Sequence, residues 1–226
     1  MQHSDYIIVA ALDLGTTCSG YALSFKSQFE TKPLEIRCNP IRSNGHILSL
    51  KTPTCVLLDE NKEFKAIGYD AENEMFNMCG KSHQKDYFLF REFYTKKNMT
   101  RDMTLKDETG KSVLASHVFK TLINAFINDL MEMLNSVQQS DIRFVIPVSA
   151  DLTDTDKQFL RYCAVQTRPI DRSALSDYIR PVDMKRPTDK FAIKHQKKKT
   201  KIVGFSLIGS RYSYYDIRQT KQTCLQ

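Results

Sequence analysis

Hydrophobic residues near the start of the chain form two runs that flank a short polar turn. The first run extends from Ile7 to Leu12 and stops at Asp13, and the second extends from Gly20 to Phe25. Apolar runs on both sides of a turn rich in glycine and threonine are typical of a β-hairpin. The pattern therefore predicts two antiparallel strands with polar side chains gathered at the tip between them.

Shorter apolar runs predict further strands in the first half of the chain. Residues 34–38 and 65–69 have the length and composition of short strands, and Asp70 follows the second of them where it would cap the next helix. The run Cys55–Leu58 comes after Pro53, which fits an edge strand that begins at a proline. The first half of the chain is therefore expected to be rich in strands.

Aromatic residues recur at helical spacing between residues 84 and 95. They are Tyr87, Phe88, Phe90, Phe93 and Tyr94. Such a stripe predicts an amphipathic helix whose aromatic face is buried in the core, rather than a ligand site.

The most regular helical pattern lies over residues 113–134. Its apolar residues repeat with a period close to 3.6, and Ser112 stands where an N-cap is expected. A helix of this length spans about 33 Å, enough to cross the back of a sheet. The near-continuous apolar run Ile142–Val148 predicts a buried strand, and Asp154 opens a helix that extends to about Val165. Together the elements predict an α/β fold with a mixed sheet and flanking helices.

The charge distribution divides the chain near residue 166. The sequence of 226 residues has a formal net charge of +7, but residues 167–226 contain 14 basic and 5 acidic residues, so the basic character belongs to this tail. The block Lys194–Lys201 fits a nuclear-localisation or nucleic-acid patch, or a solvated run in a disordered segment. The second interpretation is preferred, and a nucleic-acid partner is not expected.

The spacing of cysteine and histidine argues against several kinds of site. The six cysteines are spread over the chain with no C-x-x-C pair, and the five histidines are equally scattered. These spacings argue against a zinc site and a dense disulfide scaffold. The N-terminal apolar run is short and has no basic residues in front of it, so neither a signal peptide nor a membrane span is expected. The features predict a cytoplasmic protein without a membrane partner.

The polar turn between the first two strands carries the strongest candidate chemistry. Gly15 lets a ligand approach the backbone closely, and Thr16 and Thr17 offer hydroxyl and amide donors that suit phosphate oxygens. Asp13, at the end of a buried strand, could hold the water molecules of a Mg²⁺ ion. On these residues alone, an ordinary hairpin with a polar turn is the alternative.

The turn and several later segments resemble one known family. Asp13-Leu14-Gly15-Thr16-Thr17 is similar to the first phosphate loop of the Hsp70, actin and sugar-kinase ATPases, in its Hsp70 form. From about residue 6 to about residue 166, further segments follow in the order of the divergent Hsp70-like family called heat shock 70 kDa protein 12. These segments are Ile67–Ala71, Phe90–Phe93, Asp102–Leu105, Ile142–Val148 and Lys157–Arg161.

The resemblance implies a fold and a ligand. Residues 1–166 would form the first lobe of an actin-like ATPase with the ribonuclease H-like topology, and the ligand would be ATP with Mg²⁺. Asp13 would lie near the metal-bound water. Gly15, Thr16 and Thr17 would surround the β- and γ-phosphates.

The resemblance also bears on hydrolysis. Tyr94 stands where the family has a lysine that reaches the γ-phosphate, and a tyrosine cannot supply the same cation. On a helix, Arg91 would be the nearest basic residue on that face, whereas Lys96 and Lys97 would point elsewhere.

Residues 167–226 show no such resemblance and are expected to be a basic, irregular, disordered and non-homologous tail. The family's second phosphate loop, its Glu-Pro segment and its second lobe have no counterpart there, as expected of a truncated or alternatively spliced product or a faulty gene model. The expected function is that of a chaperone-related ATP-binding fragment that binds nucleotide weakly without turnover. The alternative is a non-enzymatic interaction or decoy protein, which binds a protein partner through the exposed face of the half-domain.

Overall fold

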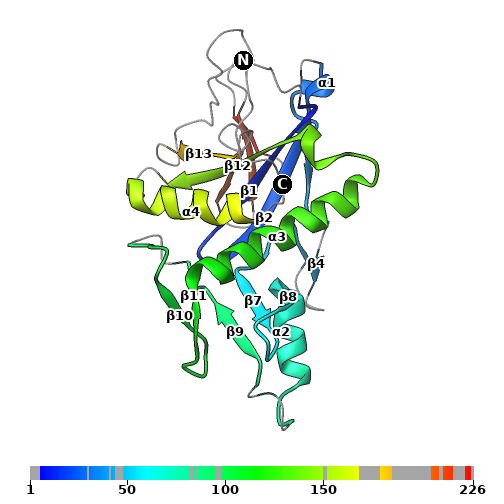
Figure 1. Ribbon diagram of the computed structural model, residues 1–226. Coiled ribbons are helices and arrows are strands. Elements are labelled where there is room, and N and C mark those ends of the chain that lie inside the picture. Colours follow the sequence, from blue (N-terminus) through cyan, green and yellow to red (C-terminus); the bar gives the residue numbers. More distant parts are fainter. Residues whose placement is uncertain are drawn as a thin grey trace.

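The computed structural model describes most of the chain up to residue 167 and four strands beyond it. The described residues are 6–29, 31–40, 42–43, 48–81, 84, 86–94, 98–149, 152–167, 179–184, 205–208, 211–215 and 222–224. They form an α/β structure in which helices pack on sheets (Figure 1).

The largest sheet is built around the first hairpin. Strand β1 (Ile8–Asp13) pairs antiparallel with β2 (Cys18–Phe25), as predicted, and parallel with β12 (Ile142–Ser149). The predicted hairpin and the mixed sheet are therefore confirmed. The strand order is β13–β12–β1–β2–β3, with β6 also paired to β2, where the outer strands are β3 (Arg37–Cys38), β6 (Thr52–Pro53) and β13 (Ile179–Met184).

Helix α3 (Ala115–Leu134) crosses the sheet and buries one face against it (Figure 1). Helix α4 (Asp154–Gln166) packs beside α3, and both helices share one hydrophobic core with β1 and β12. The predicted long helix, central strand and following helix are therefore confirmed. The buried residues of α3 follow the predicted period and are Ala115, Ser116, Val118, Phe119, Leu122, Ile123, Phe126, Ile127 and Leu130.

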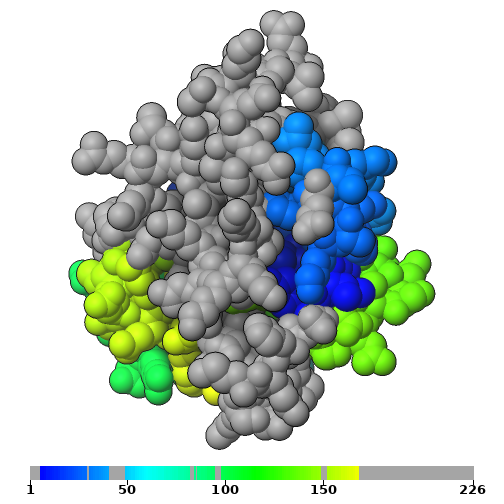
Figure 2. All heavy atoms as spheres, turned by 90° about the horizontal axis from the view of Figure 1, so that it is seen from above, coloured from blue at the N-terminus to red at the C-terminus, as the bar shows by residue number. Residues whose placement is uncertain are grey.

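Polar contacts also tie the first hairpin to α3 and to the segment after it. The hydroxyl of Tyr21 donates to Oδ2 of Asp129 at 3.0 Å, and the N–H of Ile7 donates to the carbonyl of Asp141 at 2.8 Å. Figure 2 shows the blue N-terminal segment beside the green segment that follows α3. The hairpin is therefore fixed to α3 through Tyr21 and to the segment before β12 through Ile7.

The start of α3 differs from the prediction, because Ser112 does not cap the helix. Ser112 belongs to β11 (Ser112–Leu114), which forms a hairpin with β10 (Thr104–Lys106). The first residue of the helix, Ala115, donates its N–H to the carbonyl of Met103 at 2.8 Å. A tertiary hydrogen bond thus satisfies the helix end that a side-chain cap was expected to satisfy.

The helix predicted over residues 84–95 is wrong. Phe88–Arg91 is strand β9, which pairs antiparallel with β7 (Cys55–Leu58) in a second sheet that also contains β8 (Phe64–Ile67). The two phenylalanines of β9 face the main core, whereas Leu89 packs in a smaller cluster. A strand buried on both faces carries apolar residues at consecutive positions, and here they imitate a helical stripe.

Helix α2 (Gly68–Asn77) begins earlier than predicted, so Asp70 lies in its first turn and does not cap it. The hydroxyl of Thr52 accepts a hydrogen bond from the N–H of Tyr69 at 3.0 Å. The helix end is therefore satisfied by a residue of β6, which is distant in sequence.

The start of α4 agrees with the prediction and contains a reciprocal cap. The hydroxyl of Thr153 accepts a hydrogen bond from the N–H of Asp156 at 3.2 Å, and the carboxylate of Asp156 accepts one from the N–H of Thr153 at 3.2 Å. Asp156 is fully buried and also accepts a hydrogen bond from the N–H of Met99 at 2.7 Å. This carboxylate therefore joins α4 to the segment before β10.

The remaining elements are short. They are α1 (Lys26–Phe29), β4 (Arg42–Ser43), β5 (Leu48–Ser49), a 3₁₀ turn at Gln139–Asp141, β14 (Phe205–Ile208), β15 (Arg211–Tyr215) and β16 (Gln222–Cys224). In the tail, β13 extends the main sheet in parallel with β12, and β14, β15 and β16 form a small sheet of their own. The basic block Lys194–Lys201 lies outside the described residues. None of the described helices has the length and apolar character needed to cross a membrane.

Candidate functional site

Two buried hydroxyl groups hold the turn between β1 and β2. The hydroxyl of Thr54 donates to the carbonyl of Gly15 at 2.8 Å and lies 2.7 Å from the hydroxyl of Ser19. Ser19 accepts a hydrogen bond from the N–H of Gly15 at 3.2 Å. The N–H of Thr54 also donates to the carbonyl of Thr17 at 2.8 Å. The shape of the turn is therefore set by β2 together with the residue that follows β6.

Gly15 is required by the turn itself. A Cβ at this position would lie 2.1 Å from the carbonyl oxygen of Cys18, which belongs to the backbone and cannot move aside easily. The sequence predicts that Gly15 allows close approach of a ligand. In the structure, Gly15 also allows a close approach within the turn itself, by the carbonyl oxygen of Cys18.

Thr16 and Thr17 are exposed at the tip of the turn. Within the part of the chain that the structure describes, their N–H and hydroxyl groups make no hydrogen bond. These donors are therefore available to solvent or to an anionic ligand. The exposed donors of Thr16 and Thr17 fit the oxygen atoms of a phosphate group.

Asp13 lies at the foot of the same turn and forms an ion pair that the sequence analysis missed. Nζ of Lys51 lies 2.7 Å from Oδ2 of Asp13, and the two side chains are 20% and 34% exposed, respectively. The residues are 38 positions apart in the chain, so no local spacing signals their contact. Because the pair engages Oδ2, Oδ1 is the oxygen that could hold a metal-bound water.

A cavity of about 400 Å³ opens beside the turn. Arg91 in its wall is engaged by two carboxylates, since its Nε lies 3.2 Å from Oε1 of Glu108 and 3.8 Å from Oε1 of Glu72. The sequence analysis missed the cavity because distant segments build it. The lining residues are Thr17, Cys18, Pro53, Thr54, Cys55, Glu72, Arg91 and Glu92.

The cysteine thiols at this cavity are poor nucleophiles. Burial raises the pKa of Cys18, the charge of Lys51 lowers it in part, and the carboxylates of Glu92 and Glu72 raise it further. Burial raises the pKa of Cys55 to about 12. Both thiols therefore stay protonated at neutral pH, and the site offers hydrogen-bond donors and charge rather than a nucleophile.

The sequence predicts Tyr94 and Arg91 on one helix, and this prediction is wrong. Tyr94 is 3% exposed and packs edge-to-face against Phe119, with ring centroids 5.4 Å apart. Arg91 ends strand β9 and lines the cavity instead. Tyr94 is therefore a core residue, and Lys96 and Lys97 lie outside the described residues.

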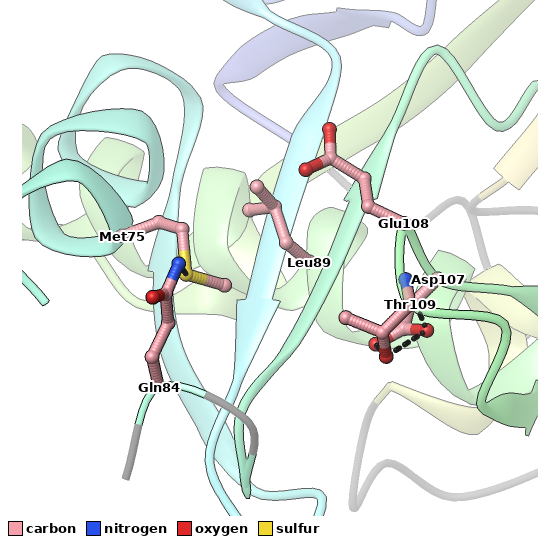
Figure 3. A pocket seen from close by; sticks show the side chains of 6 residues that line it. All are labelled: Met75, Gln84, Leu89, Asp107, Glu108 and Thr109. Atoms are coloured by element: carbon pink, nitrogen blue, oxygen red, sulfur yellow. Dashed lines mark hydrogen bonds between the residues drawn. The ribbon is translucent and has the colours of Figure 1, made fainter. Parts of the chain in front are cut away.

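A second cavity, of about 250 Å³, lies between α2 and the turn that joins β10 to β11 (Figure 3). The carboxylate of Asp107 accepts hydrogen bonds from the hydroxyl of Thr109 at 2.8 Å and from the N–H of Lys111 at 2.7 Å. These bonds close the turn, so the carboxylate serves the hairpin and is not directed to a ligand. The lining residues are Met75, Gln84, Leu89, Asp107, Glu108 and Thr109.

Direct metal coordination has no candidate among the described residues, since no three His, Cys, Asp or Glu side chains come together there. Mg²⁺ often keeps several water molecules and uses only one or two carboxylates. A single carboxylate such as Asp13 therefore fits a metal that is held through its water.

Comparison with known proteins agrees with the resemblance that the sequence suggested. The chain is 29% identical over 174 residues to heat shock 70 kDa protein 12A of Mus musculus, and 31% identical over 172 residues to heat shock 70 kDa protein 12B of Homo sapiens. These matches cover 73% and 72% of this chain but only 25% of each relative, so the chain spans about a quarter of their length. No family model matches the chain. The predicted similarity to the heat shock 70 kDa protein 12 proteins is confirmed over this part of the chain.

Two solved structures are also similar to the chain. MreB5 of Spiroplasma citri bound to ADP gives a TM-score of 0.39 at 14% identity and covers 73% of this chain and 36% of that chain. MreB 5 of Spiroplasma citri bound to AMPPNP gives a TM-score of 0.38 at 13% identity, with coverage of 71% and 35%.

Proposed function

We propose that residues 1–166 form the first lobe of an actin-like ATPase domain of the heat shock 70 kDa protein 12 type, and that the β1–β2 turn binds the phosphates of ATP. The observation that carries the proposal is the turn, in which Gly15 is fixed by close packing while Thr16 and Thr17 present exposed donors. The similarity to the heat shock 70 kDa protein 12 proteins over 72% of the chain supports this assignment.

Asp13 is proposed to hold a water molecule of the Mg²⁺ that accompanies ATP. Its Oδ1 is suited to accept a hydrogen bond from that water, while Oδ2 stays paired with Lys51. When bound, Mg²⁺ neutralises charge on the phosphates. The role of Asp13 is to position the hydrated ion beside the turn.

We expect the 226-residue chain to bind nucleotide weakly and not to hydrolyse it. Phosphoryl transfer depends on several positioned groups that act together. Tyr94, which stands at the position of the family's lysine, is buried against Phe119. Residues 167–226 show no segment similar to the second phosphate loop. The 226-residue chain therefore supplies one phosphate-binding loop, the β1–β2 turn.

The competing proposal is a non-enzymatic interaction protein that binds a protein partner through the surface of the lobe. Two large apolar side chains favour it, since Phe64 and Phe76 are 53% and 80% exposed. A calorimetric titration separates the two proposals, because only the nucleotide-binding proposal expects heat that depends on Asp13.

We also infer a cytoplasmic location, without a membrane or nucleic-acid partner. The inference is supported by the cysteine usage, because Cys18, Cys38, Cys55, Cys79 and Cys163 are free thiols.

The test is isothermal titration calorimetry of the whole chain with Mg·ATP. We expect a dissociation constant of about 0.1–1 mM for the natural sequence and binding at least about tenfold weaker for Asp13→Asn, because the variant loses the charge that orients the hydrated ion. Asp102→Asn is the matched control, since Asp102 is an exposed carboxylate outside the site.

Three outcomes would contradict the proposal in different ways. Absence of heat with the natural chain would reject nucleotide binding, and equal affinity of the natural and Asp13→Asn chains would reject the role of Asp13. Steady release of phosphate that disappears in Asp13→Ala would reject the expectation that the chain does not turn ATP over.

A further inference from the structure

The position of positive charge around the β1–β2 turn decides how an anionic ligand is held there. A phosphate chain next to Asp13 meets a carboxylate of like charge, so a cation is needed beside it. Lys51 lies 2.7 Å from Asp13 and is partly exposed, so its ammonium group stands at the foot of the turn.

The sheet topology shows how Lys51 reaches this position. Strand β2 lies between β1 and β6, and Gly20 of β2 pairs with Asp13. Ser19 pairs with Thr52, so Lys51 follows beside Gly20 on the other side of β2. The lysine side chain must cross one strand, a distance of about 10 Å between β6 and β1, to reach Asp13. The ion pair is therefore built into the register of three strands.

The electrostatic influence of Lys51 extends to the tip of the hairpin. Its positive charge acts on Cys18, the residue that follows the exposed donors of Thr16 and Thr17, and lowers the pKa of that thiol against the effect of burial. The ammonium group has three N–H donors, of which Asp13 occupies one. The remaining donors are suited to phosphate oxygens.

Other basic groups near the site are less suitable. Arg91 lines the neighbouring cavity, but its Nε is engaged by Glu108 and Glu72. Tyr94, at the position where the family resemblance implies a lysine, is buried in the core and has no cationic group. Among the residues that the structure describes, Lys51 is thus the cation that lies close to Asp13 and retains N–H donors for a ligand.

We propose that Lys51 binds the nucleotide phosphates at the β1–β2 turn and that Asp13 positions its ammonium group for this contact. The proposal rests on the proposed nucleotide binding and adds a residue from outside the loop sequence. It also explains how a carboxylate at the foot of the turn is compatible with an anion, because Lys51 offsets its charge. A consequence is that part of the affinity for nucleotide is independent of Mg²⁺.

The test is calorimetry of the whole chain with ATP, once with excess Mg²⁺ and once with EDTA. In EDTA, Lys51→Gln should weaken binding at least about tenfold, because the charge-assisted bond is lost and Asp13 then repels the phosphates. With Mg²⁺ the loss should be smaller, about threefold, since the metal supplies the missing positive charge. Lys51→Arg, which keeps the charge, should stay within about threefold of the natural chain in both conditions.

Two further variants test whether a loss of affinity for ATP is specific to Lys51. Lys65→Gln removes an exposed lysine that pairs with Glu74 away from the turn, and its affinity should equal that of the natural chain. Arg91→Gln removes the other cation at the cavity and should change affinity less than twofold. Circular dichroism melts of each variant check that the chain stays folded.

A second measurement works on the natural chain and needs no variant. Bound ATP should protect Lys51 from an amine-acylating reagent, measured by mass spectrometry of the modified peptides, and should leave Lys65 equally reactive. If the natural chain binds ATP but Lys51→Gln binds it equally well in EDTA, or Lys51 is not protected, the proposal for Lys51 is wrong and nucleotide binding stands. If the natural chain binds no ATP in either condition, both proposals fail.

Discussion

Two glycines in this chain are fixed by atoms that already occupy the space of a Cβ. At Gly15 that atom is the carbonyl oxygen of Cys18, and at Gly68 it is the hydroxyl oxygen of Thr52, only 1.6 Å from an ideal Cβ. Gly68 also has a φ of 59°, which L-residues with a Cβ adopt at a cost. Both positions lie where β6 and its neighbours meet the β1–β2 turn, so backbone close packing shapes the region of the candidate site.

Gly68→Ala tests this packing. The substitution should lower the free energy of unfolding by about 3 kcal/mol or more, because it adds a steric clash with Thr52 to the strain of a positive φ. Gly80→Ala is the matched control, since Gly80 has a φ of 79° but nothing within 4 Å of its Cβ position. The control should lose only about 1 kcal/mol. Urea unfolding followed by circular dichroism measures both, and equal losses would show that Thr52 yields freely.

Helix α4 shows how one side chain can join two elements. The carboxylate of Asp156 accepts hydrogen bonds from Thr153 within the cap and from Met99 in a distant segment, and it is fully buried. Hydrogen bonds to a buried charged group contribute more than those at an exposed helix end. The orientation of α4 against the sheet therefore depends on this residue.

Asp156→Ala should lower the free energy of unfolding by about 3 kcal/mol, because it removes the cap and leaves the N–H of Met99 without its acceptor. Asp154→Ala is the control in the same helical turn. Its carboxylate is exposed, so the loss should be about 0.5 kcal/mol. Chemical unfolding compares the two variants, and a loss at Asp156 no greater than at Asp154 would mean that the Met99 contact contributes nothing.

The elements that the sequence predicts well are those with one long, uninterrupted pattern. Helix α3 repeats its apolar residues with one helical period, and strands β1, β2 and β12 lie in apolar runs, so local sequence is sufficient. Strand β9 was mistaken for a helix because the core covers both of its faces, a property of the tertiary structure. The caps expected at Ser112 and Asp70 failed for a related reason, since bonds from distant residues satisfy those helix ends.

The residues of the candidate site also differ in whether the sequence could identify them. Its loop residues are contiguous, so Asp13, Gly15, Thr16 and Thr17 could be named from the sequence. Lys51 could not, because its contact with Asp13 depends on the order of β6, β2 and β1 in the sheet. The cavity beside the turn likewise draws on separate segments that only the fold brings together.

For the molecule as a whole, the main hydrophobic core is made by residues between Ile8 and Ala164. We propose that these residues belong to a folded unit over residues 1–166 and that the basic tail over residues 167–226 is a second part. Strand β13 of the tail pairs with β12 at the edge of the main sheet. The β1–β2 turn joins two strands of the main sheet. Ligand binding at the turn is therefore expected to change the structure of the folded unit near the turn.

The central claim is that this turn binds nucleotide phosphate, and an amide NMR titration of the ¹⁵N-labelled chain with Mg·ATP tests it most directly. The account predicts that the largest shift changes fall on the amides from Gly15 to Cys18, which include the exposed donors of Thr16 and Thr17. Smaller changes are expected at Thr54 and Lys51. Changes centred instead on the second cavity near Asp107, or no changes at millimolar ATP, would contradict the account.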